Sequence, residues 1–514
     1  MAQKLCVCLT GSTIQAQLST AREYQTLAHL YETRLDFLFS TEASSFLLVS
    51  DLVLFVNQLL QLGRPVILTA RHRKDGGVWP GDKEAWRMSI LVSLAKEFST
   101  NGKVYIDLDW GVPELDALAK ELVNASLGVL RSIHSFDSSW TPKDLEERGN
   151  GLFEAVEGEA RRFIPKIALA CEGIAQTRAI FRFGQEKRAR GFRSFLVLGM
   201  GEYGLATRVL TQWIGSEWTY STPLQGGPAA APGQLDPRTL EEVYGYSNLK
   251  GTETLFGILG NPLSHSKSPQ FHNDRFRSVG FPGVYLPFRT DDLAAGRQLM
   301  DDLGVKGLSV TIPHKEGVIS WLVDRDDGVA AVGACNTLVR TDRGWKGYNS
   351  DIPGFLAPLA HQKGLLRALV LGAGGAARAI VFGLGKMGIE VTVTNRTPQR
   401  AQELNEELQP YLPTTLLNLD WTQAPSTTGW DLIVQTTSVG MDGKSDPFDL
   451  YEWTGKEVAY DLIYTPEQTP FLLRAQRAGC ITINGWPMFE GQGQVQSRLF
   501  RRLTPGFLPD ITCV

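Results

Sequence analysis

The sequence predicts an α/β protein with a (β/α)8 barrel in its first half and two further α/β domains in its second half. Eight short apolar runs alternate with helix-like segments over about 240 residues, which matches such a barrel in count and length. A Pro-, Gly- and Ala-rich stretch at residues 222–234 interrupts this pattern. A strand, a glycine turn, a helix and a second strand begin again near residue 367, as in a nucleotide-binding βαβ unit.

Length and composition agree with several soluble domains. The chain has 514 residues, and single cores stop growing near ~250–300 residues, so two or more domains are expected. A net charge of −4 provides no global basic field, and nucleic acid is therefore not expected as a partner. Six scattered cysteines are typical of reduced thiols in a cytosol-like compartment, and Cys6 and Cys8 are expected in the core of a strand.

No targeting segment is recognised at the start of the sequence. MAQKLCVCLTG has an apolar run of about five residues, whereas a secretory leader needs ~7–15. No apolar run approaches the ~20 residues of a membrane span. We therefore expect a cytoplasmic protein that does not associate with membranes.

The order of the expected elements follows from the apolar runs. Helix-like segments such as 114–125, with Leu and Ala at helical spacing, separate most of the barrel strands. The second half begins with a strand at 255–260 and is expected to continue in βα units to about residue 350. No internal repeat is present. The barrel strands are expected at residues 4–10, 33–39, 65–71, 104–110, 127–133, 163–169, 194–200 and, weakly, 216–222.

These elements predict three domains. The barrel is expected to occupy residues 1–245. A second domain is expected at 253–350, completed by a C-terminal helix at 485–510. A nucleotide-binding domain of the Rossmann type is expected at 351–484.

Polar residues gather at the ends of the expected barrel strands, where barrels of this type carry their active sites. Lys166 lies inside the apolar strand IPKIALA, and burial would lower its pKa and free the amine as a nucleophile toward carbonyls. From spacing alone, Lys166 could equally lie outward with its head in solvent, and His134 is more simply a core histidine. The full set is Glu32, Arg34 and Asp36 within the second strand, Arg71, Asp107, Asp109, His134, Lys166, Arg208 and Gln234.

Taken together, these stretches resemble type I 3-dehydroquinate dehydratase. The resemblance is carried, in order, by YETRLDFL, ILTARHRKDGG, YIDLDW, SIHSF, IPKIA, LGMGEYGLATR and AAPGQ. It implies a TIM barrel in which Lys166 forms an imine with the substrate ketone. His134 would act as general base and then as general acid, and Arg208 would bind the substrate carboxylate. The resemblance implies as further substrate ligands Glu32, Arg34, Arg71, Asp75 and Gln234.

The first half departs from the family pattern at three positions. Asp75 stands where a Glu usually supports the catalytic histidine, and Asp is one methylene shorter. Ala230 replaces a hydroxyl residue before Ala-Pro-Gly-Gln, and Thr207 replaces a Ser. The first two departures put the rate of this half in question but leave Lys166 and His134 in place.

The turn LGAGGAAR predicts a dinucleotide site in the second half. Gly372, Gly374 and Gly375, with Ala373 and Ala376, follow a strand and open a helix whose N-terminus can face a pyrophosphate. A structural helix cap is the alternative interpretation.

The end of the next strand indicates which dinucleotide is bound. Asn395, Arg396 and Thr397, followed by Arg400, take the place of the usual acidic residue, and cations and a hydroxyl suit a 2′-phosphate. NADP(H) is therefore the expected cofactor, with a solvated basic turn as the alternative.

Stretches along the second half resemble shikimate dehydrogenase over residues 253–510. They are GNPLSHSKSP, VTIPHK, GACNTL, GYNSD, GAGGAA, NRT, TTSVGM and YDLIYTPEQTPFL. The resemblance implies that Lys315 and Asp351 form the catalytic pair and that Tyr464 lies near the nicotinamide. Ser309 stands where Asn is common, and Ser350 replaces a Thr. The implied ligands of substrate hydroxyls and carboxylate are Ser266, Ser268, Thr311, Asn336 and Gln492.

The two implied reactions are consecutive, since 3-dehydroshikimate is the product of the first and the substrate of the second. The sequence is therefore expected to encode a bifunctional enzyme that converts 3-dehydroquinate to shikimate without a metal. The main alternative is a quinate/shikimate dehydrogenase with a weak or silent dehydratase half. A dehydrogenase that uses NAD with quinate is a second alternative, which Asn395–Thr397 disfavour. A single-function Schiff-base aldolase is a third, and it leaves the second half unexplained.

Overall fold

The computed structural model describes residues 3–40, 47–79, 83–157, 163–225 and 227–503. The chain divides into two compact units. The first comprises residues 1–255, 261–274 and 282–304, and the second comprises 256–260, 275–281 and 305–514. The three domain limits expected from the sequence remain a prediction, and the part of the C-terminal helix expected beyond residue 503 lies outside the described residues.

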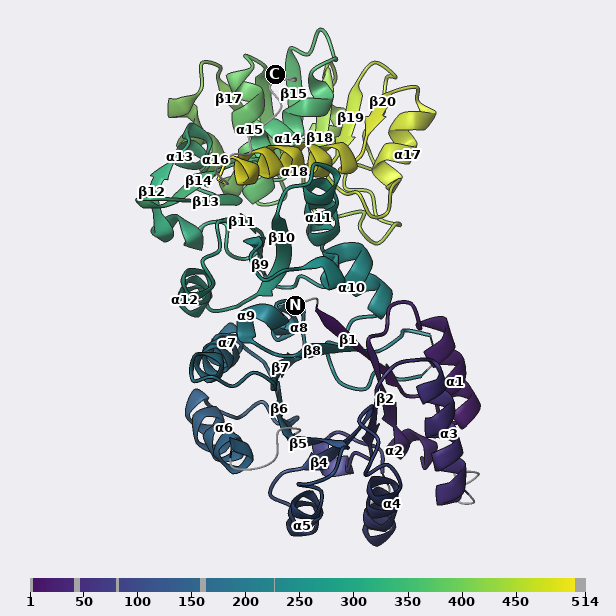
Figure 1. Ribbon diagram of the computed structural model, residues 1–514. Coiled ribbons are helices and arrows are strands. Elements are labelled where there is room, and N and C mark those ends of the chain that lie inside the picture. The colour runs from purple at the N-terminus through teal and green to yellow at the C-terminus, as the bar shows by residue number, and fades with distance from the viewer. Residues whose placement is uncertain (1–2, 41–46, 80–82, 158–162, 226, 504–514) are drawn as a thin grey trace. The chain divides into compact units, whose positions relative to one another are not determined.

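The first unit contains an eight-stranded parallel barrel with helices around it (Figure 1). Its strands are neighbours in the order β7-β6-β5-β4-β3-β2-β1-β8. The ends of this sheet meet where Glu217 N donates to Phe195 O at 2.9 Å and the Ser216 hydroxyl accepts from Val197 N at 2.9 Å. The strands are β1 (Lys4–Leu9), β2 (Leu30–Arg34), β3 (Val66–Thr69), β4 (Val104–Asp109), β5 (Gly128–Ser135), β6 (Phe163–Ala170), β7 (Leu196–Met200) and β8 (Trp218–Ser221).

Helices connect the barrel strands, and local sequence signals start several of them. The Thr13 side chain accepts from Ala16 N at 3.1 Å and caps the first helix, while Pro113 and Pro237 each occupy a first turn, where a missing N–H costs nothing. The helices are α1 (Ile14–Glu23), α2 (Leu35–Leu38), α3 (Val49–Gln61), α4 (Glu84–Glu97), α5 (Pro113–Glu121), α6 (Pro142–Glu157), α7 (Ile174–Ala189), α8 (Leu205–Val209), α9 (Thr211–Ile214) and α10 (Pro237–Tyr244).

The strand expected at residues 33–39 was misplaced. The strand β2 ends at Arg34, and the following Leu35–Leu38 is helical. Asp36 therefore lies in a helix and not within the second strand. The four residues of α2 are all buried, and a short apolar run does not distinguish a buried strand from a buried helical turn.

The interior of the barrel is filled by side chains from most of its strands. Cys6, Cys8, Ile67, Leu130 and Leu196 belong to one buried cluster. The expectation that Cys6 and Cys8 are core residues of a strand is confirmed, since both are fully buried in β1. The barrel is thus a packed core whose polar residues can gather only at its mouth.

After the barrel, the first unit also contains β10 (Gly283–Arg289) and α12 (Leu293–Leu303), while α11 (Ser268–Ser278) begins within it. In the second unit, five strands are neighbours in the order β9-β11-β13-β14-β12. The expectation of βα units up to residue 350 is wrong for β13 and β14, which form an antiparallel hairpin because a two-residue loop is too short for a crossover. These strands are β9 (Thr254–Gly260), β11 (Gly307–Val310), β12 (Leu322–Arg325), β13 (Thr337–Thr341) and β14 (Gly344–Tyr348).

The second sheet of this unit is parallel and doubly wound. Its order is β17-β16-β15-β18-β19-β20, so the strand order reverses at β15, where such sheets bind nucleotides. Its strands are β15 (Arg367–Leu371), β16 (Glu390–Asn395), β17 (Leu416–Asp420), β18 (Leu432–Gln435), β19 (Val458–Asp461) and β20 (Ile481–Ile483). The helices of the unit are α13 (Asp327–Val332), α14 (Asp351–Leu356), α15 (Gly375–Lys386), α16 (Pro398–Leu408), α17 (Pro470–Arg477) and α18 (Trp486–Arg501).

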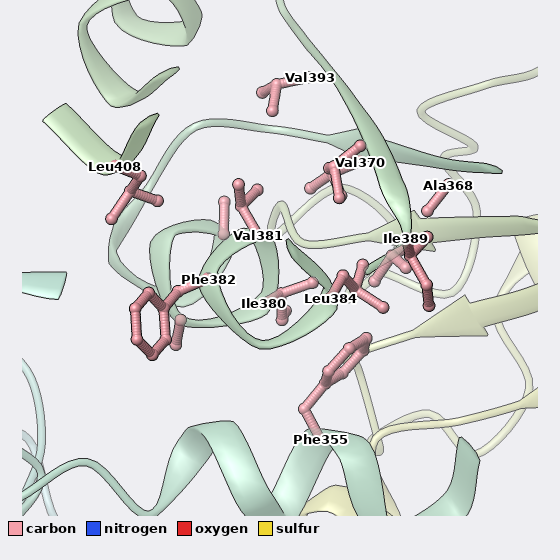
Figure 2. Close-up of a cluster of buried hydrophobic side chains, with 14 of the residues drawn as sticks. Phe355, Ala368, Val370, Ile380, Val381, Phe382, Leu384, Ile389, Val393 and Leu408 are labelled. Carbon is pink, nitrogen blue, oxygen red and sulfur yellow. The ribbon is translucent and has the colours of Figure 1, made fainter. Parts of the chain in front are cut away.

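A hydrophobic core holds the glycine-turn helix α15 against this sheet. Figure 2 shows Ile380 and Leu384 of α15 with Val370 of β15, and Phe355 of α14 on the other side of the helix. All four side chains are fully buried. Packing of this kind fixes the start of α15, and with it the glycine turn, at the end of β15.

Candidate active sites

The structure brings the catalytic and substrate residues that the resemblance implies for the first half to one cavity. This cavity opens at the carboxyl ends of the barrel strands. Its lining includes every predicted catalytic and substrate residue of that half, namely Glu32, Arg34, Arg71, Asp75, His134, Lys166, Arg208 and Gln234.

Lys166 is buried in the cavity and held among carboxylates. Its Nζ donates to Asp107 Oδ2 at 2.7 Å and lies 3.5 Å from Glu32 Oε1. The ring of Tyr220 lies 4.4 Å from the same nitrogen. The alternative of an outward, solvated Lys166 is therefore wrong, because the residue is only 4% exposed.

Asp107 is the anchor of this charge cluster. Arg71 Nη2 donates to Asp107 Oδ2 at 2.8 Å, and the Ser132 hydroxyl donates to Asp107 Oδ1 at 2.5 Å. Burial by itself would raise the pKa of Asp107, but Arg71 and Lys166 hold that pKa well below its usual range. The carboxylate therefore stays ionised and keeps the Lys166 amine in place.

His134 is buried in the same cavity, and its protonation is disfavoured. Burial, together with the positive charges of Arg71 and Lys166, lowers the pKa of His134 well below 6.5. Its Nδ1 has no hydrogen-bond partner within the described part of the chain, and Asp109 Oδ1 lies 3.9 Å away. The imidazole is thus neutral, as a general base has to be.

Asp75 was expected to support this histidine. Burial and the nearby Asp109 raise the pKa of Asp75. Among the described residues, no hydrogen bond joins Asp75 to His134. The carboxylate within 4 Å of the imidazole is that of Asp109, a strand-end residue of β4.

Arg208 is a buried cation whose hydrogen-bonding capacity is largely unused. Its Nη2 donates to Pro232 O at 3.1 Å, but its Nε and Nη1 are buried without a partner in the described chain. Burial lowers the pKa of Arg208 to about 10. An unpaired guanidinium at a cavity wall is suited to a carboxylate ligand.

Several cavity residues were not singled out from the sequence. The Thr69 hydroxyl donates to Glu32 Oε1 at 3.0 Å, and the Cys8 thiol donates to Glu32 Oε2 at 3.3 Å. Phe136, Met200 and Tyr220 also line the cavity. The available signal was position, since most of these residues lie at or next to the carboxyl ends of barrel strands.

The second unit places Lys315 beside Asp351. Lys315 Nζ donates to Asp351 Oδ2 at 2.6 Å, and both side chains keep some solvent contact. Asp351 begins α14, and Cys335 N donates to Lys315 O at 2.8 Å. The loop that follows β11 and the start of α14 are thus held together at the end of the β13–β14 hairpin.

The remaining predicted substrate residues lie on both units. Thr311 follows β11, and its N donates to Leu259 O at 3.0 Å. A Cβ added to Gly354 of α14 would lie 2.8 Å from Gln492 Cβ, so α18 packs closely on the helix that carries Asp351. Tyr464 is 37% exposed and packs edge-on against Trp486.

Ser266 and Ser268 belong to the first compact unit and precede or begin α11. The Ser266 hydroxyl accepts from Ser268 N at 3.3 Å. They therefore form a local turn, and their role as ligands stays a prediction.

The glycine turn has the shape that a dinucleotide phosphate needs. Gly372 has φ +113°, and a Cβ there would lie 2.6 Å from Thr436 Oγ1, so only glycine fits without strain. Gly374 and Gly375 face open space, and no side chain caps α15 at Gly374. The free N–H groups of the first turn can therefore receive a pyrophosphate.

The basic turn after β16 lies at the end of the neighbouring strand. Asn395 Nδ2 donates to Thr397 O at 2.8 Å, which closes the turn. Arg396 and Arg400 are exposed, and neither forms an ion pair within the described chain. The residues present thus fit a dinucleotide with a 2′-phosphate.

Two features are absent from the described residues. None of the helices there has the length and apolar character needed to cross a bilayer. No group of three or more His, Cys, Asp or Glu residues in that part of the chain is arranged to hold a metal ion.

Three known families match successive parts of the chain. Type I 3-dehydroquinase matches residues 5–250. The shikimate dehydrogenase substrate binding domain matches residues 258–338, and shikimate / quinate 5-dehydrogenase matches residues 359–428.

One relative matches nearly the whole chain, and others match about half of it. The chloroplastic bifunctional 3-dehydroquinate dehydratase/shikimate dehydrogenase of Arabidopsis thaliana is 29% identical over 95% of this chain and 80% of its own length. The shikimate dehydrogenase (NADP(+)) of Shouchella clausii is 38% identical over 46% of this chain and 89% of its own length. A solved shikimate 5-dehydrogenase of Thermus thermophilus in complex with NADP(H) and shikimate is 36% identical, covers 49% of this chain and 95% of its own, and has a TM-score of 0.44. The chain therefore belongs to the family of bifunctional type I 3-dehydroquinate dehydratase/shikimate dehydrogenases.

Proposed function

We propose that this protein dehydrates 3-dehydroquinate in the barrel and reduces the product, 3-dehydroshikimate, with NADPH in the second half. One observation carries the first reaction: Lys166, a neutral His134 and an unpaired Arg208 line the same cavity. A buried amine, a base and a carboxylate-binding cation are what Schiff-base dehydration of a keto acid requires.

In the barrel, the Arg208 guanidinium would bind the substrate carboxylate. Once its extra proton has passed to a base of the cavity such as His134, the Lys166 amine would attack the ketone carbon. Return of that proton to the carbinol oxygen would let water leave and give an iminium. The iminium accepts the electron pair when His134 Nε2 or Nδ1 removes a proton from the adjacent carbon. His134 then returns that proton to the leaving hydroxyl, and hydrolysis of the imine frees Lys166, so the net reaction releases one water.

In the second half, NADPH supplies the hydride when it is bound. The glycine turn at Gly372–Gly375 would hold its pyrophosphate, and Arg396 and Arg400 its 2′-phosphate. Lys315 would donate a proton to the carbonyl oxygen as it gains charge, with Asp351 Oδ2 orienting the ammonium at 2.6 Å. Asn336, Gln492, Thr311 and the two serines of the first unit are proposed to bind hydroxyls and carboxylate of the substrate.

The compartment, the binding partners and the domain limits of this protein are also proposals. The protein is proposed to act in a reducing, cytoplasm-like compartment, since five buried cysteines are free thiols. Its proposed partners are small molecules and not nucleic acid or membranes, because the net charge is −4. The domain limits 1–245, 253–350 with the C-terminal helix, and 351–484 are proposed as the units that carry the two reactions.

The test combines trapping with a coupled assay. Protein incubated with 3-dehydroquinate and borohydride is expected to gain one substrate-derived mass on the peptide that contains Lys166. Lys166→Ala is expected to lose this adduct and all dehydration while it still oxidises shikimate with NADP. Dehydration that persists in this variant would exclude the imine mechanism.

Addition of 3-dehydroquinate to the parent protein and NADPH is expected to produce 3-dehydroshikimate and consume NADPH. Enone accumulation without NADPH loss would favour a silent second half. NADPH loss only after addition of 3-dehydroshikimate would favour the alternative of a silent barrel. The departures from the family pattern at Asp75 and Ala230 would then be the first positions to test as the cause of the lost dehydration.

A further inference from the structure

A buried amide on the last helix connects three elements of the dehydrogenase site. Gln496 lies on α18, one turn after Gln492, and is 2% exposed. Its Oε1 accepts from the Ser309 hydroxyl of β11 at 2.8 Å. Its Nε2 donates to Asn336 O at 3.3 Å and to Thr337 Oγ1 at 3.0 Å.

These bonds impose a direction on the Thr337 hydroxyl. A hydroxyl has one hydrogen, and since Thr337 Oγ1 accepts from Gln496, its hydrogen is free to point elsewhere. It donates to Asn336 Oδ1 at 2.9 Å. The order of donors is therefore Gln496, then Thr337, then Asn336.

The Asn336 amide receives further donors from the start of α14. Ser350 N donates to Asn336 Oδ1 at 2.7 Å, and the Ser350 hydroxyl lies 3.0 Å from the same oxygen. All these bonds of the Asn336 side chain end on Oδ1, which leaves Nδ2 to donate to a ligand. Ser350 directly precedes Asp351, so the same network also holds the residue that binds Lys315.

We propose that Gln496 is a positioning residue of the dehydrogenase, which fixes the orientation of the Asn336 amide so that Nδ2 faces a substrate hydroxyl. This inference rests on the proposed reduction of 3-dehydroshikimate and adds to it a residue that does not touch substrate. Without Gln496, the Thr337 hydroxyl can turn toward Ser350 Oγ, 3.0 Å away, and the Asn336 amide loses one of the donors that hold it.

The burial of Gln496 supports a role in the site over a role in packing alone. A buried amide is costly unless it is fully hydrogen-bonded, so an apolar residue would be the simpler choice at a packing position. The bonds of Gln496 reach the end of β11, which precedes Thr311, and the start of β13 beside Asn336. Through Asn336 Oδ1 the network continues to Ser350, next to Asp351. No comparable network is found for Gln494, two residues earlier and on another face of α18, within the described chain.

The register of β11 and β13 indicates a position at which a second substitution could replace the lost amide of Gln496. Ser309 and Thr337 are Cα partners in the antiparallel β11–β13 pair, so their side chains project to the same face. Asn at position 309, the residue expected there from the family resemblance, would carry an amide directly opposite Thr337. Ser309→Asn is therefore expected to compensate for the loss of Gln496.

The test uses the full chain and shikimate oxidation with NADP. Gln496→Ala is expected to raise the KM for shikimate about tenfold, the effect of one lost hydrogen bond, and to leave the KM for NADP within about twofold. Gln496→Glu, which keeps the acceptor and the length but loses the donor, is expected to raise the KM for shikimate in the same way. Ser309→Asn in the Gln496→Ala background is expected to return most of the lost affinity, and Gln494→Ala is the matched control.

Dehydration of 3-dehydroquinate by the same chains reports whether each variant is folded. An unchanged KM for shikimate in both Gln496 variants, or an equal rise in both KM values, would overturn the proposal. Recovery of thermal stability without recovery of the shikimate KM in the double variant would overturn it as well. Absence of shikimate oxidation in the parent protein, with dehydration intact, would instead count against the proposed function of the second half.

Discussion

Replacement of Arg208 by Met should make the barrel more stable and the dehydratase inactive. Arg208 is 2% exposed, its Nε and Nη1 are unpaired in the described chain, and its pKa falls from 12.5 to about 10. The folded protein thus holds this proton less tightly than the unfolded chain. Burial of the charge therefore lowers stability at every pH below about 10, and this loss is recovered as the pH rises from about 10 to 12.5.

The size of the effect follows from the lowered pKa. At 1.36 kcal/mol for each tenfold change in proton affinity, the fall to about 10 corresponds to about 3 kcal/mol at pH 7. Met has a similar length and no charge, so it removes this cost. The bond from Nη2 to Pro232 O is lost, at about 1 kcal/mol, but Pro232 O still accepts from Gly201 N at 3.1 Å. A net gain of about 2 kcal/mol remains, or roughly 4–8 °C in the melting temperature of a domain of this size.

The assay compares unfolding of the barrel with turnover of both halves. Arg208→Met is expected to shift the denaturant midpoint upward and to reduce kcat/KM for 3-dehydroquinate by at least about 100-fold, because the substrate carboxylate loses its partner. Shikimate oxidation should not change. Arg182→Met, at an exposed position on α7, is the matched control and should alter neither property.

Two results would refute this reasoning. A variant with lower stability would mean that contacts within the fold stabilise the charge of Arg208, and that this charge does not depend on a ligand for its partner. A variant with unchanged affinity for 3-dehydroquinate would mean that the carboxylate binds elsewhere in the cavity.

Three further predictions concern the two sites. Arg396→Ala and Arg400→Ala should each raise the KM for NADP by about tenfold with little effect on NAD, measured by initial rates; equal effects on both cofactors would contradict a 2′-phosphate site. Gly372→Ala should lower the free energy of unfolding of the second half by about 1–3 kcal/mol and weaken NADP binding, because φ is +113° and Thr436 Oγ1 lies 2.6 Å from the added Cβ. The control Gly375→Ala, whose added Cβ faces open space, should change the free energy of unfolding little. Because burial and the nearby cations lower the pKa of His134, kcat/KM for dehydration should hold at pH values below 6.5, and an acid limb at or above 6.5 would be the contrary result.

Much of the architecture could be predicted from the sequence because it depends on local patterns. Parallel strands that are buried on both faces read as short apolar runs, and seven of the eight barrel strands were placed correctly in this way. The exception is β2, because a short apolar run such as Leu35–Leu38 can form either a buried strand or a buried helical turn, and apolar character alone does not distinguish the two. The glycine turn was recognisable because only glycine tolerates the backbone of Gly372.

The candidate site residues of the barrel could also be selected from local sequence, because they lie near the ends of the expected strands. In a parallel barrel every strand presents its carboxyl end at the same mouth, so polar side chains near those ends were expected to lie close together. The family resemblance, and not the spacing, assigned Lys166, His134 and Arg208 to this site. Their electrostatic state could not be read from sequence, because it depends on distances between segments far apart in the chain. The pairing of Lys166 with Asp107, the neutral His134 beside Asp109 and the unpaired Arg208 are of this kind.

The sequence by itself thus determined which residue types lie at which strand ends, and hence the class of chemistry. Only the tertiary structure decided which of those groups touch. It placed Asp109, and not Asp75, within 4 Å of His134, and it joined Gln496 of the last helix to Ser309, 187 residues earlier. The physical reason is that charge and hydrogen-bond energies fall off over a few ångströms, and spacing along the chain carries no information on that scale.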